Sequence, residues 1–252
     1  MQALRTALRA GVAALAFLTR IPVGRWVALD GDDVARGSVL FPVVGAGIGA
    51  LVGLTVTGLD ARLTALLAAA LAVAVEALLT GAIHLDAVAD SADALGAPSR
   101  ERALEVMREP AIGAFGATAL LLDVAVKVAA LAAVAAGPDA LLVVAAAYGL
   151  GRTAPLVLGW ALPYARAEAG SGALFTGGAG EVSRALGAGI GVGLAVAVLG
   201  SRGLALVGAA AVVLAVVGFA AQRRLGGVTG DVLGAATELA TTAALVAAVA
   251  TR

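Results

Sequence analysis

Cysteine is absent from this chain and charged residues are scarce, and each shortage excludes a class of function. Without cysteine there is no disulfide framework, no thiolate nucleophile and no cysteine-bound metal. Charged residues make up 13% of the chain, against about 25% in ordinary soluble domains. The formal net charge is zero, which removes the usual argument for nucleic-acid binding from a basic surplus. Any chemistry therefore depends on carboxylates, hydroxyls, bases or a metal held by oxygen.

Long uncharged runs occupy most of the 252 residues, and 61% of the residues are hydrophobic. The mean hydropathy is +1.02. Runs such as 37–59 and 203–222 contain no charge and are long enough to cross about 30 Å of hydrocarbon as helices. We predict an all-α, polytopic integral membrane protein with a single transmembrane domain over residues 1–252. The seven predicted spans are 39–58, 62–83, 113–136, 140–162, 185–201, 203–222 and 232–250.

The N-terminal segment, 1–38, is predicted to be cytoplasmic or interfacial. Its apolar stretch, 10–19, is too short to span a bilayer and is followed directly by Arg20. An interfacial amphipathic helix fits this pattern, and a buried connector fits it equally well. The segment has no small-residue cleavage pattern, so we expect it to be retained rather than removed as a signal peptide.

The arginines predict the orientation. Twelve of them fall in the segments 1–38, 84–112, 163–184 and 223–224, which lie on one predicted side of the membrane. Only Arg62, Arg202 and Arg252 fall on the other side. The positive-inside bias places the N-terminus, an acidic helix and loop at 84–112 and a loop at 163–184 in the cytoplasm. We therefore expect a multi-pass protein of a prokaryotic cytoplasmic (inner) membrane, with its active site facing the cytoplasm.

Three aspartates interrupt the apolar sequence where the second predicted span ends. Asp86, Asp90 and Asp93 are spaced i, i+4, i+7, so on a helix they share one face. No basic residue occurs between Arg62 and Arg100 to neutralise them. Such a cluster persists when a cation binds it, when the carboxylates share protons, or when all three face water. Hard oxygen ligands on one face favour Mg²⁺, which binds through a few carboxylates together with substrate phosphates.

A second acidic pair lies at the predicted cytoplasmic start of the last span. Asp231 and Glu238 are i and i+7 and share a face. Asp231 is also placed to act as a helix N-terminal carboxylate after a cap at Thr229. Glu238 lies inside the span, where ionisable groups are costly and usually line a cavity or carry function. The same reasoning predicts that the other charged residues within spans face the bundle interior. These are Glu76, Asp123, Lys127 and Arg152.

Two of these buried charges allow a structural interpretation. Asp123 and Lys127 are i, i+4 and are expected to neutralise each other. Arginine is the side chain best shaped to hold phosphate, so Arg108 and Arg152 are candidate phosphate contacts. Arg166 fits either a headgroup anchor or a phosphate contact. Carboxylates for a metal and arginines for phosphates, on a membrane scaffold, indicate phosphoryl transfer involving a nucleotide-activated substrate.

Several motifs together resemble one family. HLDAVADSADALGA, at 84–97, is similar to the His-Leu-Asp-Gly-Leu-Ala-Asp-x-x-Asp signature of the cobalamin synthase family, adenosylcobinamide-GDP ribazoletransferase. Ala87 stands where that family usually has glycine. The resemblance extends along nearly the whole chain through FLTRIPVG at 17–24, FPVVGAGIG at 41–49, MREPAIGAFG at 107–116, GRTAPL at 151–156, PYAR at 163–166 and GGVTGDVLGAATEL at 226–239.

The resemblance implies a cobalamin-biosynthesis transferase that uses Mg²⁺. Adenosylcobinamide-GDP would react with α-ribazole or its 5′-phosphate, giving adenosylcobalamin or its 5′-phosphate and GMP. The residues expected to take part in catalysis are Asp86, Asp90 and Asp231. The expected metal ligands are Asp86, Asp90, Asp93, Asp231 and Glu238, and the expected phosphate or cofactor contacts are Arg108, Lys127 and Arg152. Expected partners are the two substrates, the lipid bilayer and either a second copy of the chain or other late cobalamin-pathway enzymes.

Two alternative functions stay open on the sequence alone. A membrane phosphotransferase like the CDP-alcohol phosphatidyltransferases also uses an aspartate-rich motif, but that motif needs Ala-Arg after its first Asp-Gly pair, and this chain has Ala89-Asp90. A cation channel or transporter would use the acidic face as an ion entrance, with Glu76 and Glu238 along the path. That reading gives no reason for the arginine-bearing loops.

Overall fold

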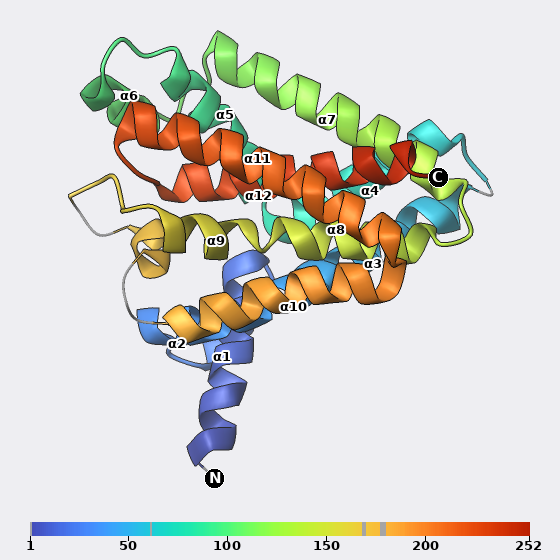
Figure 1. Ribbon diagram of the computed structural model, residues 1–252, viewed down its shortest axis with the longest axis horizontal. Coiled ribbons are helices and arrows are strands. Elements are labelled where there is room, and N and C mark those ends of the chain that lie inside the picture. The colour runs from blue at the N-terminus through green and yellow to red at the C-terminus, as the bar shows by residue number, and fades with distance from the viewer. Residues whose placement is uncertain (1, 61, 168–169, 177–179) are drawn as a thin grey trace.

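A computed structural model describes residues 2–60, 62–167, 170–176 and 180–252 of the chain (Figure 1). Within these ranges the chain is helical, and its only β-type pairing is an isolated bridge between Tyr164 and Val228. The α-helices are α1 (Gln2–Leu18), α2 (Gly31–Gly37), α3 (Phe41–Asp60), α4 (Ala65–Thr80), α5 (Ile83–Leu95), α6 (Arg100–Val106), α7 (Ala114–Ala135), α8 (Ala140–Gly151), α9 (Ala154–Ala161), α10 (Glu181–Leu199), α11 (Ser201–Leu225) and α12 (Gly230–Ala250). Short 3-10 turns occur at η1 (Pro22–Trp26), η2 (Ser38–Leu40) and η3 (Ser171–Phe175).

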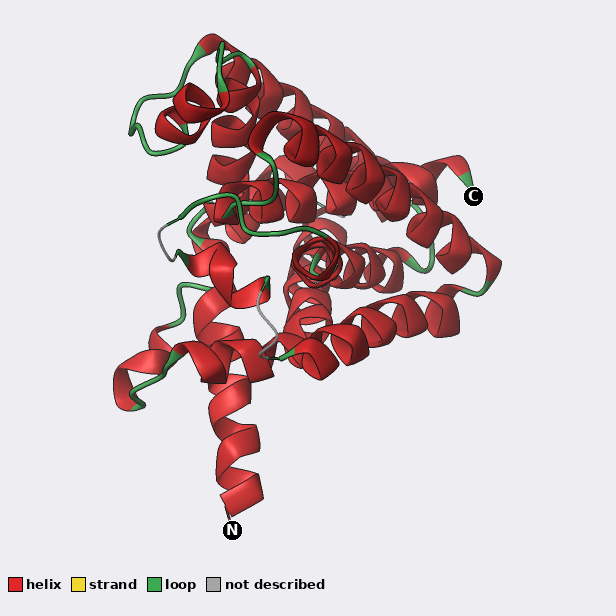
Figure 2. Ribbon diagram, turned by 60° about the vertical axis from the view of Figure 1, so that its left-hand side comes forward, coloured by secondary structure: helices red, strands yellow, loops and turns green. Residues whose placement is uncertain are grey.

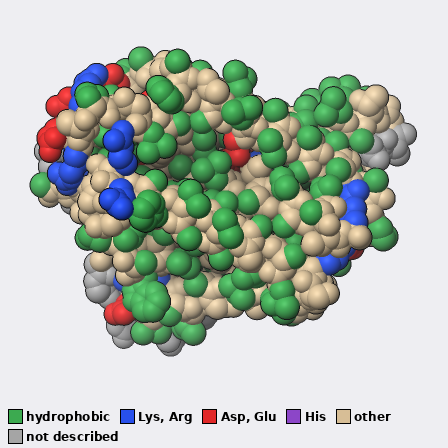
Figure 3. All heavy atoms as spheres, turned by 45° about the horizontal axis from the view of Figure 1, so that its top comes forward, with side chains coloured by type: hydrophobic (Ala, Val, Ile, Leu, Met, Phe, Trp, Pro, Cys, Tyr) green, Lys and Arg blue, Asp and Glu red, His purple; other side chains and the backbone are tan. Residues whose placement is uncertain are grey.

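The long apolar helices confirm the predicted membrane bundle. Six segments in the described chain are long and apolar enough to span a bilayer, and the pair α4 and α5, bent by 92°, makes a seventh if it forms one broken span. The six segments are Gly31–Leu59, Ala114–Ala135, Ala140–Ala161, Glu181–Leu199, Ser201–Leu225 and Gly230–Ala250. Figure 3 shows one face of the bundle, covered mainly by hydrophobic side chains, with the charged side chains gathered mostly toward its ends.

Two predicted spans are broken by features that hydropathy does not reveal. The second is only 16 residues long as α4, because Gly81 (φ 67°) and Ala82 (φ 56°) take left-handed conformations and turn the chain into α5. The fourth is divided into α8 and α9 around Thr153, whose hydroxyl donates to the Leu150 carbonyl at 2.6 Å. Pro155, which has no N–H to donate, stands in the first turn of α9.

Small residues bring the helices of the bundle close together. α3 lies along α8, and a Cβ added at Gly49 would stand 2.7 Å from the Val144 carbonyl oxygen. Close approach of this kind is how helices gain packing energy in lipid, where no hydrophobic force drives them together. α12 is the central helix and packs against α5, α7, α8, α9 and α11. Its N-terminal turn therefore lies beside the acidic helix α5.

The N-terminal helix α1 extends beyond the predicted apolar stretch. In Figures 1 and 2 it runs across the direction of the long helices, and its N-terminal half projects away from the bundle. Its C-terminal half is anchored, since Ala13, Ala14 and Leu18 are buried. Leu8 on the projecting half is 62% exposed. The helix thus combines the two alternatives, a buried connector at one end and an exposed amphipathic segment at the other.

Candidate functional site

Two of the three aspartates on α5 line a cavity of about 730 Å³ between α5, the segment before α7, α7 itself and the start of α12. Asp86 and Asp90 project into it from α5, and Asp231 reaches it from α12. Arg108 and Glu109 belong to the same wall. Residues more than 120 positions apart in the sequence are brought together because α5 and α12 pack side by side.

Like charges crowd this cavity. Asp86, Asp231 and Asp93 all lie near enough to Asp90 for their charges to act on it, and Arg166 opposes them. Arg166 Nη2 donates to Asp231 Oδ2 at 3.0 Å, which places this arginine inside the site rather than at a headgroup. Carboxylates this close disfavour one another's charged form unless a cation joins them. The arrangement therefore suits a bound cation or a cationic substrate group.

Asp231 is held by its own helix start. Thr229 caps α12, and its side-chain oxygen accepts from the Val232 N–H at 3.2 Å. The Thr229 hydroxyl is also 3.4 Å from Asp231 Oδ2. The predicted cap at Thr229 is confirmed, and the carboxylate that follows it still reaches the cavity.

Asp93 lies on the same helix but is engaged elsewhere. Its two carboxylate oxygens accept from the Gly113 N–H at 2.7 Å and the Gly116 N–H at 2.8 Å. These amides open α7, whose N-cap residue Gly113 has no side chain to satisfy them. Asp93 thus serves as a cap supplied from α5 and ties the acidic helix to α7.

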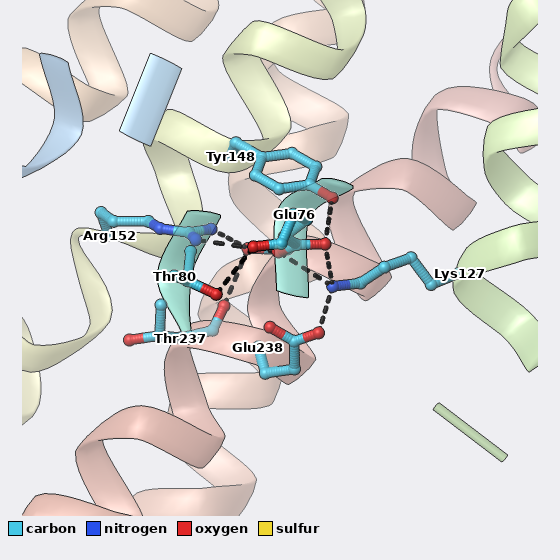
Figure 4. Close-up of polar contacts among 8 residues, drawn as sticks. Glu76, Thr80, Lys127, Tyr148, Arg152, Thr237 and Glu238 are labelled. Carbon is cyan, nitrogen blue, oxygen red and sulfur yellow. Dashed lines mark hydrogen bonds and ion pairs between the residues drawn. The ribbon is translucent and has the colours of Figure 1, made fainter. Parts of the chain in front are cut away.

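Four of the five charged residues predicted inside the spans, all except Asp123, form a second, separate group, drawn in Figure 4. Lys127 Nζ forms an ion pair with Glu76 Oε2 at 3.2 Å and a closer one with Glu238. The Tyr148 hydroxyl donates to Glu76 Oε2 at 2.6 Å. None of these side chains is more than 4% exposed. We call Glu76, Lys127, Tyr148, Arg152 and Glu238 the buried ion cluster.

Arg152 completes the buried ion cluster from the end of α8. Its guanidinium lies over the Tyr148 ring, 5.1 Å from the ring centroid, and 3.8 Å from Glu76 Oε1. Nη1 also donates to the Thr241 hydroxyl at 3.3 Å. The prediction that the intramembrane charges face the interior is confirmed, since Glu76, Asp123, Lys127, Arg152 and Glu238 are all buried.

Two details of the sequence prediction differ from this arrangement. Lys127 contacts Glu76 and Glu238 rather than Asp123, because α4 and α12 bring their carboxylates closer than the i, i+4 neighbour on its own helix. Glu238, expected beside Asp231, lies within the buried ion cluster. Tyr148 carried no sequence signal beyond being polar in an apolar run, whereas Glu76 was predicted to face the interior but its partners were not.

The donor set of the acidic cavity fits Mg²⁺ only in part. Across the residues that the structure describes, no three histidine, aspartate or glutamate side chains converge closely enough to hold a metal ion by themselves. Asp86, Asp90 and Asp231 nevertheless present hard oxygen donors to one cavity. Mg²⁺ commonly binds through one or two carboxylates and takes its remaining ligands from water and substrate phosphates, which agrees with such an open set.

Comparison with known proteins gives a consistent result. The family model described as cobalamin-5-phosphate synthase matches residues 10–249. A Shigella flexneri protein named adenosylcobinamide-GDP ribazoletransferase is 39% identical over 232 residues, which cover 90% of this chain and 94% of the relative. Proteins of the same name from Escherichia coli O17:K52:H18 and Shigella boydii serotype 4 are 38% identical with the same coverage. No solved structure matches.

Proposed function

This chain belongs to the cobalamin-5-phosphate synthase family, and from that premise we propose how its acidic cavity works. Membership and the names of the relatives support an adenosylcobinamide-GDP ribazoletransferase, the enzyme of nucleotide-loop assembly in cobalamin biosynthesis. The reaction joins α-ribazole, or its 5′-phosphate, to adenosylcobinamide-GDP and releases GMP. The observation that carries our assignment of the site is the meeting of Asp86, Asp90 and Asp231 at one cavity with Arg108 in its wall.

The chemistry is a displacement at phosphorus. A ribose hydroxyl oxygen of the ribazole forms a bond to the phosphorus attached to the cobinamide, and the bond from that phosphorus to the bridging oxygen breaks. The attacking hydroxyl is not the 5′-hydroxyl, because that oxygen carries the phosphate in α-ribazole 5′-phosphate and keeps it in the product. GMP leaves with the bridging oxygen, and the hydroxyl proton passes to a base. In such reactions the protein mainly positions the reactants and neutralises charge. A site at the meeting point of two helices, with acidic and basic side chains in one wall, suits this task.

Each carboxylate has a distinct place in the proposal. Asp86 and Asp90, one turn apart on α5, would hold Mg²⁺ against the pyrophosphate. When bound, the ion neutralises phosphate charge as the leaving group departs. Asp231, held by Arg166, is either a further ligand or the base that accepts the hydroxyl proton. Arg108 is placed to contact phosphate oxygens.

The four remaining predicted site residues take other roles. We propose that Asp93 caps the start of α7 instead of binding the metal, because both of its oxygens already accept backbone N–H groups. Lys127 and Arg152 belong to the buried ion cluster, where they form ion pairs with Glu76 and, for Lys127, with Glu238. Glu238 belongs with them.

We place this cavity at the cytoplasmic face of a prokaryotic inner membrane. The support is the arginine distribution, which puts the 84–112 and 163–184 segments on the side richer in arginine. Both segments contribute to the site, through Asp86, Asp90 and Arg166. GMP and α-ribazole are soluble molecules, so a site on this side can exchange them with the cytoplasm.

GMP release tests the proposed function. Purified, detergent-solubilised protein is given adenosylcobinamide-GDP, α-ribazole and Mg²⁺, with parallel reactions lacking α-ribazole or containing EDTA. We expect GMP and a cobalamin product only in the complete reaction. Absence of GMP from protein that gives a cooperative thermal transition would overturn the proposal, and turnover unaffected by EDTA would overturn its Mg²⁺ part alone.

A further inference from the structure

Arg20 connects the end of α1 to the bend that precedes the acidic helix. Its backbone N–H donates to the Leu79 carbonyl at 2.7 Å, next to the end of α4. The preceding residue, Thr19, is also fixed, since its hydroxyl donates to the Leu15 carbonyl at 2.7 Å and accepts from the Ile21 N–H at 3.3 Å. The backbone around Arg20 is therefore held from both sides.

The side chain of Arg20 lies across Gly81. A Cβ added at Gly81 would stand 2.8 Å from Arg20 Cγ and 3.0 Å from Arg20 Cδ, and still closer to Nε. The next residue, Ala82, lines the acidic cavity, and its carbonyl accepts from the Asp86 N–H at 2.9 Å. The arginine therefore passes the bend about one helical turn before the first carboxylate of the site.

The bend itself is held in an unfavourable conformation. Ala82 has φ 56°, a left-handed conformation that costs a residue with a Cβ about 1–2 kcal/mol. Such positions persist when the surrounding structure over-determines them, and they cluster at functional sites. The left-handed turn at Ala82 sets where α5 begins, and therefore where Asp86 lies relative to Arg20.

The guanidinium of Arg20 is not engaged by the protein. In the part of the chain that the structure describes, it makes no hydrogen bond or ion pair, and Arg20 is exposed. Other arginines near the site are occupied. Arg100 donates to the Leu225 and Ala165 carbonyls, and Arg166 to Asp231. Arg20 thus combines a fixed backbone with five unused N–H donors, and its side chain lies against Gly81, the neighbour of the cavity-lining residue Ala82.

We propose that Arg20 binds a phosphate group of the nucleotide-activated substrate at the rim of the acidic cavity. This inference rests on the proposed function, since it names the residue that would grip the pyrophosphate of adenosylcobinamide-GDP. A guanidinium fits phosphate oxygens in two-pronged fashion. Phospholipid headgroups offer the same oxygens, but the anchoring of Arg20 on the bend before Asp86 favours the substrate.

The test separates substrate binding from general stability. The KM for adenosylcobinamide-GDP is measured in neutral detergent for wild type, Arg20→Gln and Arg20→Lys. Loss of a charge-assisted hydrogen bond predicts a rise in KM of about 10- to 100-fold in Arg20→Gln, with the KM for α-ribazole unchanged and a smaller rise in Arg20→Lys. Arg5→Gln, an exposed arginine on the projecting half of α1, is the matched control and keeps the wild-type KM.

Gly81→Ala displaces the guanidinium without removing it. The added Cβ meets the Arg20 side chain, so this variant is expected to share the raised KM. If Arg20→Gln has a wild-type KM, or changes activity only in vesicles that contain anionic phospholipid, the proposal is wrong and the arginine is a lipid anchor.

A binding measurement keeps this inference distinct from the reaction itself. Inorganic pyrophosphate is used as the probe, and its binding to the solubilised protein is measured with Mg²⁺ present. Wild type is expected to bind it at least about tenfold more tightly than Arg20→Gln. That result holds even if GMP release fails, whereas equal binding in a wild type that does release GMP would overturn the role of Arg20 alone.

Discussion

Lys127 and Glu238 form an ion pair between α7 and α12 in which neither side chain is more than 1% exposed. Glu76 contacts the same ammonium from α4, at 3.2 Å. Three helices far apart in the sequence thus meet at one buried lysine. Breaking a buried pair by removing one partner leaves an uncompensated charge, which is more costly than removing both.

Lys127→Met is therefore expected to destabilise the protein more than either the double variant Lys127→Met/Glu238→Gln or the surface variant Arg102→Met. Loss of the lysine leaves the Glu238 carboxylate unpaired and removes one of the partners of Glu76, which costs about 3–5 kcal/mol. The double variant Lys127→Met/Glu238→Gln leaves only Glu76, which retains Tyr148 and Arg152, so it should recover part of the loss. Thermal midpoints in detergent check the order. The exposed arginine of the Arg102–Glu105 pair gives the matched control, and Arg102→Met should cost less than about 1 kcal/mol. Equal losses in the single and double variants would contradict the ion-pair account.

Asp86→Asn and Asp90→Asn are expected to abolish turnover without unfolding the protein. Each substitution removes a negative oxygen donor from the cavity at nearly constant volume, so GMP release should fall by about a hundredfold or more. Asp32→Asn, at an exposed carboxylate on α2, serves as the control and should retain activity. A rate within a factor of a few of wild type in both cavity variants, with normal thermal midpoints, would remove these two aspartates from the site.

Asp93 should respond differently from its neighbours on α5. Because it accepts two backbone N–H groups at the start of α7, Asp93→Ala is expected to destabilise the protein by about 1–3 kcal/mol. Asp93→Asn keeps one acceptor oxygen and should lose less. The Mg²⁺ concentration at half-maximal activity should stay the same in Asp93→Asn. A large increase in that concentration would instead return Asp93 to the metal site.

Removing Arg166 should lower the Mg²⁺ concentration that gives half-maximal activity. The guanidinium competes for Asp231, at 3.0 Å, so Arg166→Gln frees that carboxylate and makes the cavity more negative. We expect half-maximal activity at a lower Mg²⁺ concentration, by a factor of a few, together with a lower maximal rate. A Mg²⁺ titration of GMP release checks both quantities. A higher Mg²⁺ requirement would mean that Arg166 supports the metal site instead of opposing it.

The absence of cysteine makes the orientation directly measurable. Arg62→Cys and Glu105→Cys each place a single thiol at an exposed position, on opposite predicted sides of the membrane. In intact cells a membrane-impermeant maleimide is expected to label Arg62→Cys only. After the cells are opened, both variants should react. Labelling of Glu105→Cys in intact cells would invert the orientation and place the acidic cavity outside.

Hydropathy and spacing predicted the bundle and half of the site, and the reasons for the misses are specific. Uncharged length located the spans because a bilayer imposes one thickness on every helix. The i, i+4 spacing of Asp86 and Asp90 placed both in one cavity. The same periodicity extended to Asp93, but the amides of Gly113 and Gly116 compete for its carboxylate, and helix spacing on α5 contains no information about α7.

Partner choice inside the membrane was also beyond the sequence. The cost of a charge in lipid predicted that Lys127 and Arg152 point inward. It did not predict their partners, because the carboxylates come from residues 51 and 111 positions away in the case of Lys127. The sequence indicates only part of the bend before α5. Glycine, as at position 81, commonly ends a helix, whereas alanine at position 82 gives no sign of a left-handed backbone.

The order in which the residues of the buried ion cluster are synthesised affects how the helices insert into the membrane. Glu76 is synthesised before Lys127, and Glu238 only 111 residues after it. An unpaired lysine at the centre of a helix costs about 2.5–3.5 kcal/mol on translocon insertion scales. We expect Glu76 of α4 to pair with Lys127 of α7 while α7 inserts into the bilayer during synthesis. α12 inserts last, and Glu238 then forms the second ion pair with the lysine.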